Sequence, residues 1–196
     1  MKFKRTKSGL SLVELIVVIS IFAGISLLVL VKFSVFNNTI LTNNLAYDIA
    51  LSIRQAQTFG INVRGVGIGG SAVFDTGFGV RFSSSSPGSY IFFGDTNKDK
   101  QYQGSELIEV FSLLGGNVIS EICGVLSSGL ENCTSLGDIS AIDIVFTRPD
   151  PDAVIRSHSP EVSYQSAKIY LTSPKGIERL ITTELTGQIS VQASDR

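Results

Sequence analysis

Oxygen-bearing side chains recur between residues 95 and 106 at the spacing of a calcium-binding loop. Asp95, Asn97 and Asp99 fall at the first, third and fifth positions of such a loop, and Glu106 falls at the last. Ca²⁺ takes about six to eight oxygen ligands, and this spacing can wrap them around one point. Lys100 stands where such loops need Gly for a sharp turn, and it adds a positive charge. The sequence predicts either a weak calcium site at these four residues or an ordinary acidic turn between strands.

The chain has only two cysteines, Cys123 and Cys133, which rules out a zinc site built from thiolates alone. Outside the cytoplasm, two cysteines that close a short loop usually pair. A disulfide here would stabilise the fold by roughly 3 kcal/mol through loop-closure entropy. The alternative is a pair of free, buried thiols.

Two further motifs predict no chemistry. Residues 65–70 contain a literal G-x-G-x-x-G, but a dinucleotide site needs a strand before this motif and a helix after it. Here a helical pattern precedes and a turn and strand follow, so we interpret the glycines as a loose crossover from helix to sheet. His158 is the only histidine, and we expect it in a loop. No Ser/His/Asp arrangement stands out, and we expect no enzymatic activity.

Residues 10–31 form a 22-residue apolar segment, interrupted only by Ser11, Glu14, Ser20, Gly24 and Ser26. As a helix it would reach about 33 Å, enough to cross a hydrocarbon core of about 30 Å. Residues 1–9 carry four basic residues and no acid. This asymmetry predicts that the leader stays in the cytoplasm and the remainder lies outside. The small-residue cleavage pattern of a secretory signal does not follow the apolar segment.

Glu14 is unusual within this segment. A carboxylate inside a membrane span costs about 2.5–3.5 kcal/mol on insertion scales, so it should have a partner. If the chain is cut after Gly9, Leu10 becomes the new N-terminus and Glu14 becomes the fifth residue. The cationic amine of a neighbouring, axially shifted helix can then pair with the carboxylate and set the register of a filament. The alternative is an uncleaved signal anchor.

A basic leader, Gly9, an apolar residue and Glu14 at the fifth mature position together resemble the N-terminal signature of the type IV pilin and pseudopilin family. The resemblance implies cleavage after Gly9 by a membrane aspartyl prepilin peptidase, followed by N-methylation of Leu10. Phe is the commonest residue at this position in the family, and Leu10 is a tolerated variant.

The helical pattern continues beyond the apolar segment. Leu41, Leu45, Ile49, Ile53 and Ala56 recur at steps of four or three and draw one apolar stripe. The polar residues expected on the other faces are Asn43, Asn44, Asp48, Arg54, Gln55 and Gln57. Gly60 is a plausible helix stop. We therefore expect one helix over residues 10–60, with residues 10–31 in the membrane and the remainder packed on the body, as in pilins.

After Gly60 the sequence predicts short strands separated by turn signals. The expected strands are 72–74, 78–82, 90–93, 107–113, 142–146, 167–172, 177–184 and 188–191. The spacing favours antiparallel meanders or hairpins on one face of the long helix, an α+β arrangement. The predicted organisation is a cleaved leader (1–9), a long helix (10–60) and a single β-rich, pilin-like extracytoplasmic domain (61–196).

Four stretches of the body are similar to the pseudopilin H and FimT-type minor pilin group. They are residues 78–82, 90–95, 143–152 and 186–190. The resemblance implies no catalytic residue in any of them. It implies a structural subunit of a type IV pilus or a type II secretion pseudopilus, anchored in the cytoplasmic membrane by a single span. The expected partners are the prepilin peptidase and other pilins or pseudopilins, and no cofactor is required, with calcium as the one candidate.

From residue 33 onward the chain has 11 Lys and Arg residues against 16 Asp and Glu, a net charge of −5. Nucleic-acid binding depends on Lys and Arg contacts to phosphates, so this balance disfavours it. Two alternatives stay open. One is a DNA-binding minor pilin for DNA uptake, with a local basic patch from Arg148, Arg156, Lys168, Lys175 and Arg179. The other is an uncleaved single-span protein with an extracytoplasmic binding domain.

Overall fold

The computed structural model describes residues 11–62, 66–68, 71–73 and 76–194. The predicted leader, Gly9 and Leu10 lie outside the described residues. The chain divides into two compact units, Met1–Asn37 and Asn38–Arg196. A single 50-residue helix, α1 (Leu12–Ile61), belongs to both units, since the division falls within it. The second half of this helix thus belongs to the same compact unit as the strands.

The predicted apolar stripe on the second half of α1 is confirmed. Leu45, Ile49, Ile53 and Ala56 are buried, and Leu41 packs against the edge of the core. These side chains repeat at steps of three and four, so they face the same side of the helix. Burial of this stripe attaches the helix to the sheets.

Gln57, which we expected on the polar face of α1, is buried instead. Its side-chain amide donates hydrogen bonds to the carbonyl oxygens of Pro151 (2.9 Å) and Gly187 (3.3 Å). Two satisfied donors offset the cost of burying the amide. Gln57 therefore connects the helix to two loops between strands.

Gly60 also has a different role from the predicted one. The helix continues one residue beyond it, to Ile61, so Gly60 does not terminate the helix. A Cβ atom at this position would lie 2.4 Å from the carbonyl oxygen of Phe146. Glycine is needed here because the end of the helix approaches the backbone of a strand.

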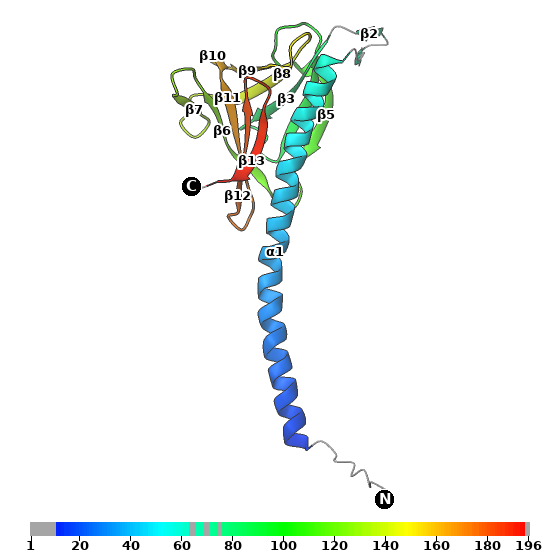
Figure 1. The fold of residues 1–196 in the computed structure, drawn as a ribbon, viewed down its shortest axis with the longest axis vertical. Helices are drawn as coiled ribbons and strands as arrows, with labels where there is room; N and C mark the ends of the chain where they lie inside the picture. The colour runs from blue at the N-terminus through cyan, green and yellow to red at the C-terminus, as the bar shows by residue number, and fades with distance from the viewer. Residues whose placement is uncertain (1–10, 63–65, 69–70, 74–75, 195–196) are drawn as a thin grey trace, which may run out of the picture. The chain divides into compact units, whose positions relative to one another are not determined.

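The body is built from thirteen strands and one short 3-10 helix among the described residues (Figure 1). They are β1 (Val66–Ile68), β2 (Ser71–Val73), β3 (Gly77–Ser83), β4 (Ser89–Asp95), η1 (Gly104–Glu106), β5 (Leu107–Ser112), β6 (Val118–Val125), β7 (Glu131–Cys133), β8 (Ala141–Phe146), β9 (Ala153–His158), β10 (Glu161–Tyr164), β11 (Ser166–Thr172), β12 (Glu178–Glu184) and β13 (Ile189–Ala193). The protein is α+β, as expected.

The strands form two larger antiparallel sheets and one hairpin. The first sheet has the order β10-β9-β8-β3-β4-β5, and the second has the order β13-β12-β11-β6-β7. The meanders β3-β4-β5, β8-β9-β10 and β11-β12-β13 connect sequential neighbours, as the turn signals predict. The pairings of β3 with β8 and of β6 with β11 join segments that are distant in sequence.

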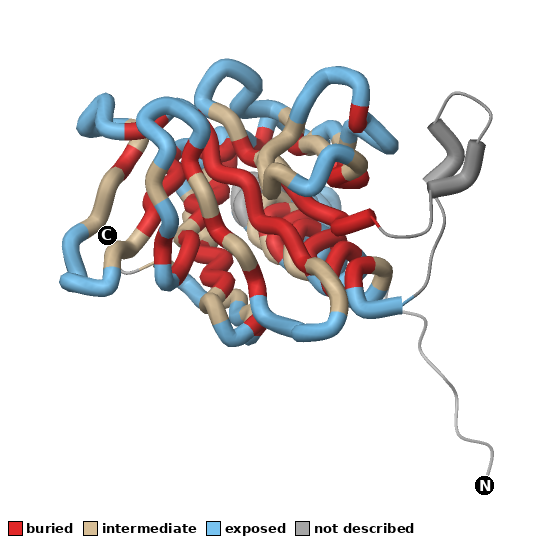
Figure 2. The backbone as a smooth tube through the Cα atoms, turned by 90° about the horizontal axis from the view of Figure 1, so that it is seen from above, coloured by how far each residue is buried: buried red, intermediate tan, exposed pale blue. Residues whose placement is uncertain are grey.

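The core lies where the two sheets meet the second half of α1. One continuous apolar cluster draws side chains from the helix and from both sheets, for example Ile53, Ile144 and Ile169. The rings of Phe78 and Phe92 lie 5.5 and 6.0 Å from that of Phe59 on the helix, both edge-on. Figure 2 shows the buried backbone gathered at the centre of this unit, with exposed turns around its rim.

The G-x-G-x-x-G segment overlaps a small hairpin. β1 pairs with β2 in antiparallel register, with Val66 opposite Val73. Three of the glycines, Gly65, Gly69 and Gly70, lie outside the described residues. A strand, not a helix, follows the motif, which is the wrong context for a dinucleotide site. The segment that we expected to be a loose crossover from helix to sheet therefore contains a two-stranded β-hairpin.

Candidate functional site

The first part of α1 presents apolar side chains to its surroundings. Residues Leu12–Leu30 have a mean hydropathy of 2.7 and are not buried within the structure. This 19-residue stretch is long and apolar enough to cross a membrane. The hydroxyl of Ser20 donates to the carbonyl oxygen of Ile16 one turn earlier (2.8 Å), so the helix itself satisfies this polar group.

Glu14 lies in the first turn of α1 and is exposed. It is the only charged residue in Leu12–Leu30. A carboxylate near a helix N-terminus interacts favourably with the helix dipole, which offsets part of its cost in an apolar environment. The proposed processing residues Gly9 and Leu10 precede the described part of the helix.

Asp95, the last residue of β4, is fully buried, and its Oδ2 atom lies 3.3 Å from both the backbone nitrogen and the Nζ atom of Lys100 in the loop that follows. Burial raises the pKa of the Asp95 carboxyl above its ordinary value, although Lys100 opposes this shift. Lys100 has a φ of 65°, in the left-handed region that usually favours Gly. This backbone conformation brings the ammonium group of Lys100 back to the carboxylate.

Glu106, at the end of the same loop, is also buried and accepts hydrogen bonds on both oxygens. Its Oε1 atom accepts from the backbone of Thr96 (2.9 Å) and Asn97 (3.4 Å), and its Oε2 atom accepts from the backbone of Gln103 (3.0 Å). The carboxylate therefore holds the two ends of the loop together with bonds from within the protein.

Asn97 and Asp99 stabilise turns within the loop. The side-chain oxygen of Asn97 accepts from the backbone nitrogen of Asp99 (3.1 Å), and Asp99 accepts in the same way from Gln101 (2.9 Å). These are Asx turns, in which a side chain replaces a backbone acceptor two residues on. The side chain of Asn97 is exposed and that of Asp99 is half-buried.

The calcium site at these four residues stays a prediction. Among the described residues, the only His, Cys, Asp and Glu side chains with three ligand atoms within 4.8 Å of one another are Glu121, Cys123 and Cys133. The carboxylates of Asp95, Asp99 and Glu106 thus do not converge, and an ammonium group lies against Asp95. In this arrangement Lys100 is the cation that neutralises the buried carboxylate of Asp95.

Cys123 and Cys133 form a disulfide that joins directly opposed residues of β6 and β7, with a Cα–Cα distance of 4.1 Å. The sulfurs are therefore not available as metal-binding thiolates. Tyr170 and Leu180 pack around the bridge as a second, smaller apolar cluster.

An ion pair between a half-buried arginine and a buried carboxylate lies beside the acidic loop and was not predicted from the sequence. Arg81 on β3 lies 2.9 Å from the carboxylate of Asp143 on β8, which also accepts from the backbone of Tyr102 (3.1 Å). Burial raises the pKa of the Asp143 carboxyl, while Arg81 opposes the shift. Arg81 and Asp143 are directly opposite each other on paired strands. The ion pair could have been predicted from the sequence only if the pairing of β3 with β8 had been known.

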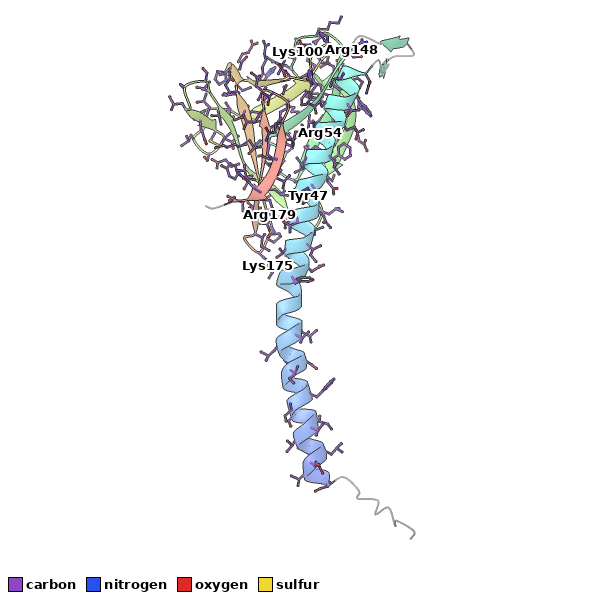
Figure 3. All side chains as sticks on the ribbon, in the orientation of Figure 1. Tyr47, Arg54, Lys100, Arg148, Lys175 and Arg179 are labelled. Carbon is purple, nitrogen blue, oxygen red and sulfur yellow. A yellow bond between two sulfur atoms is a disulfide. The ribbon has the colours of Figure 1, made fainter. Side chains whose placement is uncertain are left out.

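The basic residues considered for nucleic-acid binding are dispersed. Lys168 pairs with Glu131 (2.6 Å) and Arg156 pairs with Glu161 (3.4 Å). Figure 3 places Arg148 beside Lys100 at one end of the β-rich unit, and Lys175 and Arg179 at the opposite end. His158, expected in a loop, is the last residue of β9 and is exposed.

Comparison of the chain with known protein families, with characterised proteins and with solved structures found no match.

Proposed function

We propose that this chain is the precursor of a type IV pilin-like protein, a structural subunit of a type IV pilus or type II secretion pseudopilus. The observation that carries the proposal is the contrast between the two parts of α1. One continuous helix has an apolar, exposed first part and a second part buried against two antiparallel sheets. An exposed apolar helix requires lipid or other apolar helices around it. A filament subunit meets both of these surroundings: lipid while it is stored in the membrane, and the apolar helices of other subunits once it is assembled.

In this role the chain is cut after Gly9, and the amine of Leu10 is methylated. Glu14 then lies in the first turn of the mature helix, where its carboxylate pairs with the N-terminal amine of a neighbouring subunit. The pairing sets the axial register of the filament, and the absence of any other charge in Leu12–Leu30 supports the assignment of this role to Glu14.

The basic leader keeps the N-terminus in the cytoplasm, and the β-rich unit lies outside. The disulfide between Cys123 and Cys133 supports this orientation, because disulfides persist in oxidising compartments. The role requires no cofactor and no catalytic group. The dispersed basic residues give the DNA-binding alternative no additional support.

Replacement of Glu14 by Ala tests the assembly role. The variant should insert and be cleaved normally, because removal of the carboxylate relieves about 2.5–3.5 kcal/mol of insertion cost. Its incorporation into filaments should fall at least about tenfold, equivalent to the loss of about 1.4 kcal/mol of contact free energy. Quantification of the subunit in sheared filaments and in membranes measures both effects.

The matched control is Ser20→Ala in the same apolar stretch, since the Ser20 hydroxyl bonds only within its own helix as far as the described contacts show. This control should assemble as the wild type does. Incorporation of Glu14→Ala at wild-type levels would show that Glu14 is not the assembly contact.

A further inference from the structure

Strand β5 is an exposed apolar edge. Among the strands that the structure describes, it pairs with β4 alone and ends the larger sheet. Leu107, Ile108 and Val110 are exposed, and half of Val110 is accessible to solvent. Native proteins usually protect such edges, because unpaired backbone groups beside apolar side chains invite another strand.

The other three outer strands of the two larger sheets are less suited to pairing. β10 has four residues and carries Glu161, and β7 has three residues and carries Glu131; both acids pair with basic residues. On β13 the exposed positions include the polar Ser190 and Gln192. A short or polar edge discourages strand addition. β5 alone among these edges combines six residues with an apolar exterior.

A groove lies beside this edge, between β5 and α1. It has a volume of about 350 Å³, and its lining includes Leu45, Leu51, Tyr90, Phe111 and Leu113. Leu51 on the helix is 64% exposed, and Leu114 after the strand is 65% exposed. The groove and the strand edge share the segment around Phe111, so they form one continuous surface. We call the exposed edge of β5 together with this groove the β5 surface.

Two carboxylates mark the β5 surface as acidic. Asp48 lines the groove from α1, and Glu109 is exposed on β5. Burial raises the pKa of the Tyr90 hydroxyl, the bond from Ser52 opposes the shift, and the charges of Asp48 and Glu109 raise it further. Both carboxylates are therefore within electrostatic reach of the same hydroxyl. The lining contains no Lys or Arg.

We propose that the β5 surface binds an extended, apolar segment of a different subunit of the filament. The segment adds a strand to β5, places an apolar side chain in the groove and pairs a Lys or Arg with Glu109, while Asp48 adds to the attraction. Strand addition supplies main-chain hydrogen bonds, while the groove and the charges select the partner. This inference rests on the proposed function, since it assumes that other filament subunits surround the chain.

The charges select against a second copy of this chain. A symmetric pairing of two β5 strands would bring each Glu109 close to its counterpart, and like charges across a strand pair are unfavourable. The net charge of −5 from residue 33 onward adds to this repulsion. The same carboxylates disfavour anionic phospholipid as the occupant.

Site-specific photo-crosslinking of the full chain, in cells that express the complete filament system, tests the proposal. The crosslinking residue replaces Val110 on β5, or in the control Leu130, which is 66% exposed on the turn between β6 and β7. The Val110 probe should capture an apolar peptide with a Lys or Arg from one other subunit, identified by mass spectrometry. The Leu130 probe should not capture this peptide.

Charge reversal provides the decisive comparison. Glu109→Lys should reduce the Val110 crosslink at least tenfold, and Lys→Glu or Arg→Glu at the captured cation should restore it. Capture of another copy of this chain, capture of lipid, no crosslink, or a crosslink unaffected by Glu109→Lys would overturn the proposal. If one of these results occurs while processing and filament incorporation are normal, the proposal for the β5 surface is wrong and the proposed function still stands. If the chain is neither processed nor incorporated, the proposed function fails as well.

Discussion

Replacement of Lys100 by Met should destabilise the β-rich unit more than its position in a loop would indicate. Lys100 is the charged neighbour of Asp95, whose side chain is fully buried, and the Nζ–Oδ2 distance is 3.3 Å. Met retains the length of the side chain and the cost of the left-handed backbone, so the change removes mainly the positive charge. It leaves a buried carboxylate without its counterion.

Loss of one partner of a buried ion pair typically costs about 3–5 kcal/mol. We expect about 3 kcal/mol for Lys100→Met, because the backbone nitrogen of Lys100 still donates to Asp95. Asp95→Asn removes the charge that needs the lysine. The double variant should therefore recover about 2–3 kcal/mol relative to the sum of the single variants, near the upper end for contacting pairs. Lys100→Gly should be milder than Lys100→Met, since Gly relieves about 1–2 kcal/mol of left-handed strain.

Equilibrium urea unfolding of the purified chain in mild detergent measures these differences. The chain has five Tyr and no Trp, and every Tyr lies after residue 38. The near-ultraviolet circular dichroism of tyrosine thus reports on the unit that contains the loop. An additive double variant, or a Lys100→Met variant as stable as the wild type at neutral pH, would refute the reasoning that Lys100 neutralises Asp95.

Three further predictions use the same assay. Millimolar calcium and EDTA should give the same unfolding midpoint, whereas a site in hundredfold excess over its Kd would add about 2.7 kcal/mol. Cys123→Ser with Cys133→Ser should lower the free energy of unfolding by about 3 kcal/mol, and a reductant should then have no further effect on this variant. Burial raises the folded-state pKa of Asp95. The folded state therefore binds a proton first as pH falls from 7 towards the ordinary carboxyl pKa, and the wild type should gain stability relative to Asp95→Asn over that range. A difference that is constant with pH would contradict this sign.

The helix and most strands were predictable because their side-chain periods are clear. β9 was missed for a physical reason: its buried positions are Ala153, Ile155 and Ser157, which alternate in burial but not in hydrophobicity. Ser157 is buried because its hydroxyl donates to the carbonyl oxygen of Pro160. β6 was missed because Ser120, Glu121 and Gly124 interrupt its apolar pattern. Local patterns do not reveal polar groups that are satisfied by distant parts of the chain.

The acidic loop shows the same limit. The spacing indicated which residues belong to one loop. Both buried carboxylates do accept hydrogen bonds from residues of this loop: Glu106 from Thr96, and Asp95 from Lys100. Spacing did not reveal which atoms would occupy the carboxylate oxygens. Lys100 was recognised as a departure from the calcium pattern, but its contact with Asp95 depends on a left-handed backbone that residue type alone does not predict.

Identification of the mature N-terminus tests the central claim most directly. The measurement is intact-mass and N-terminal peptide analysis of the chain from membranes of cells with an active prepilin peptidase, with Gly9→Ala as the matched processing variant. Our account predicts a chain that begins at Leu10 with a methylated amine, and a Gly9→Ala variant that retains the leader. A wild-type chain that still begins at Met1 would contradict it.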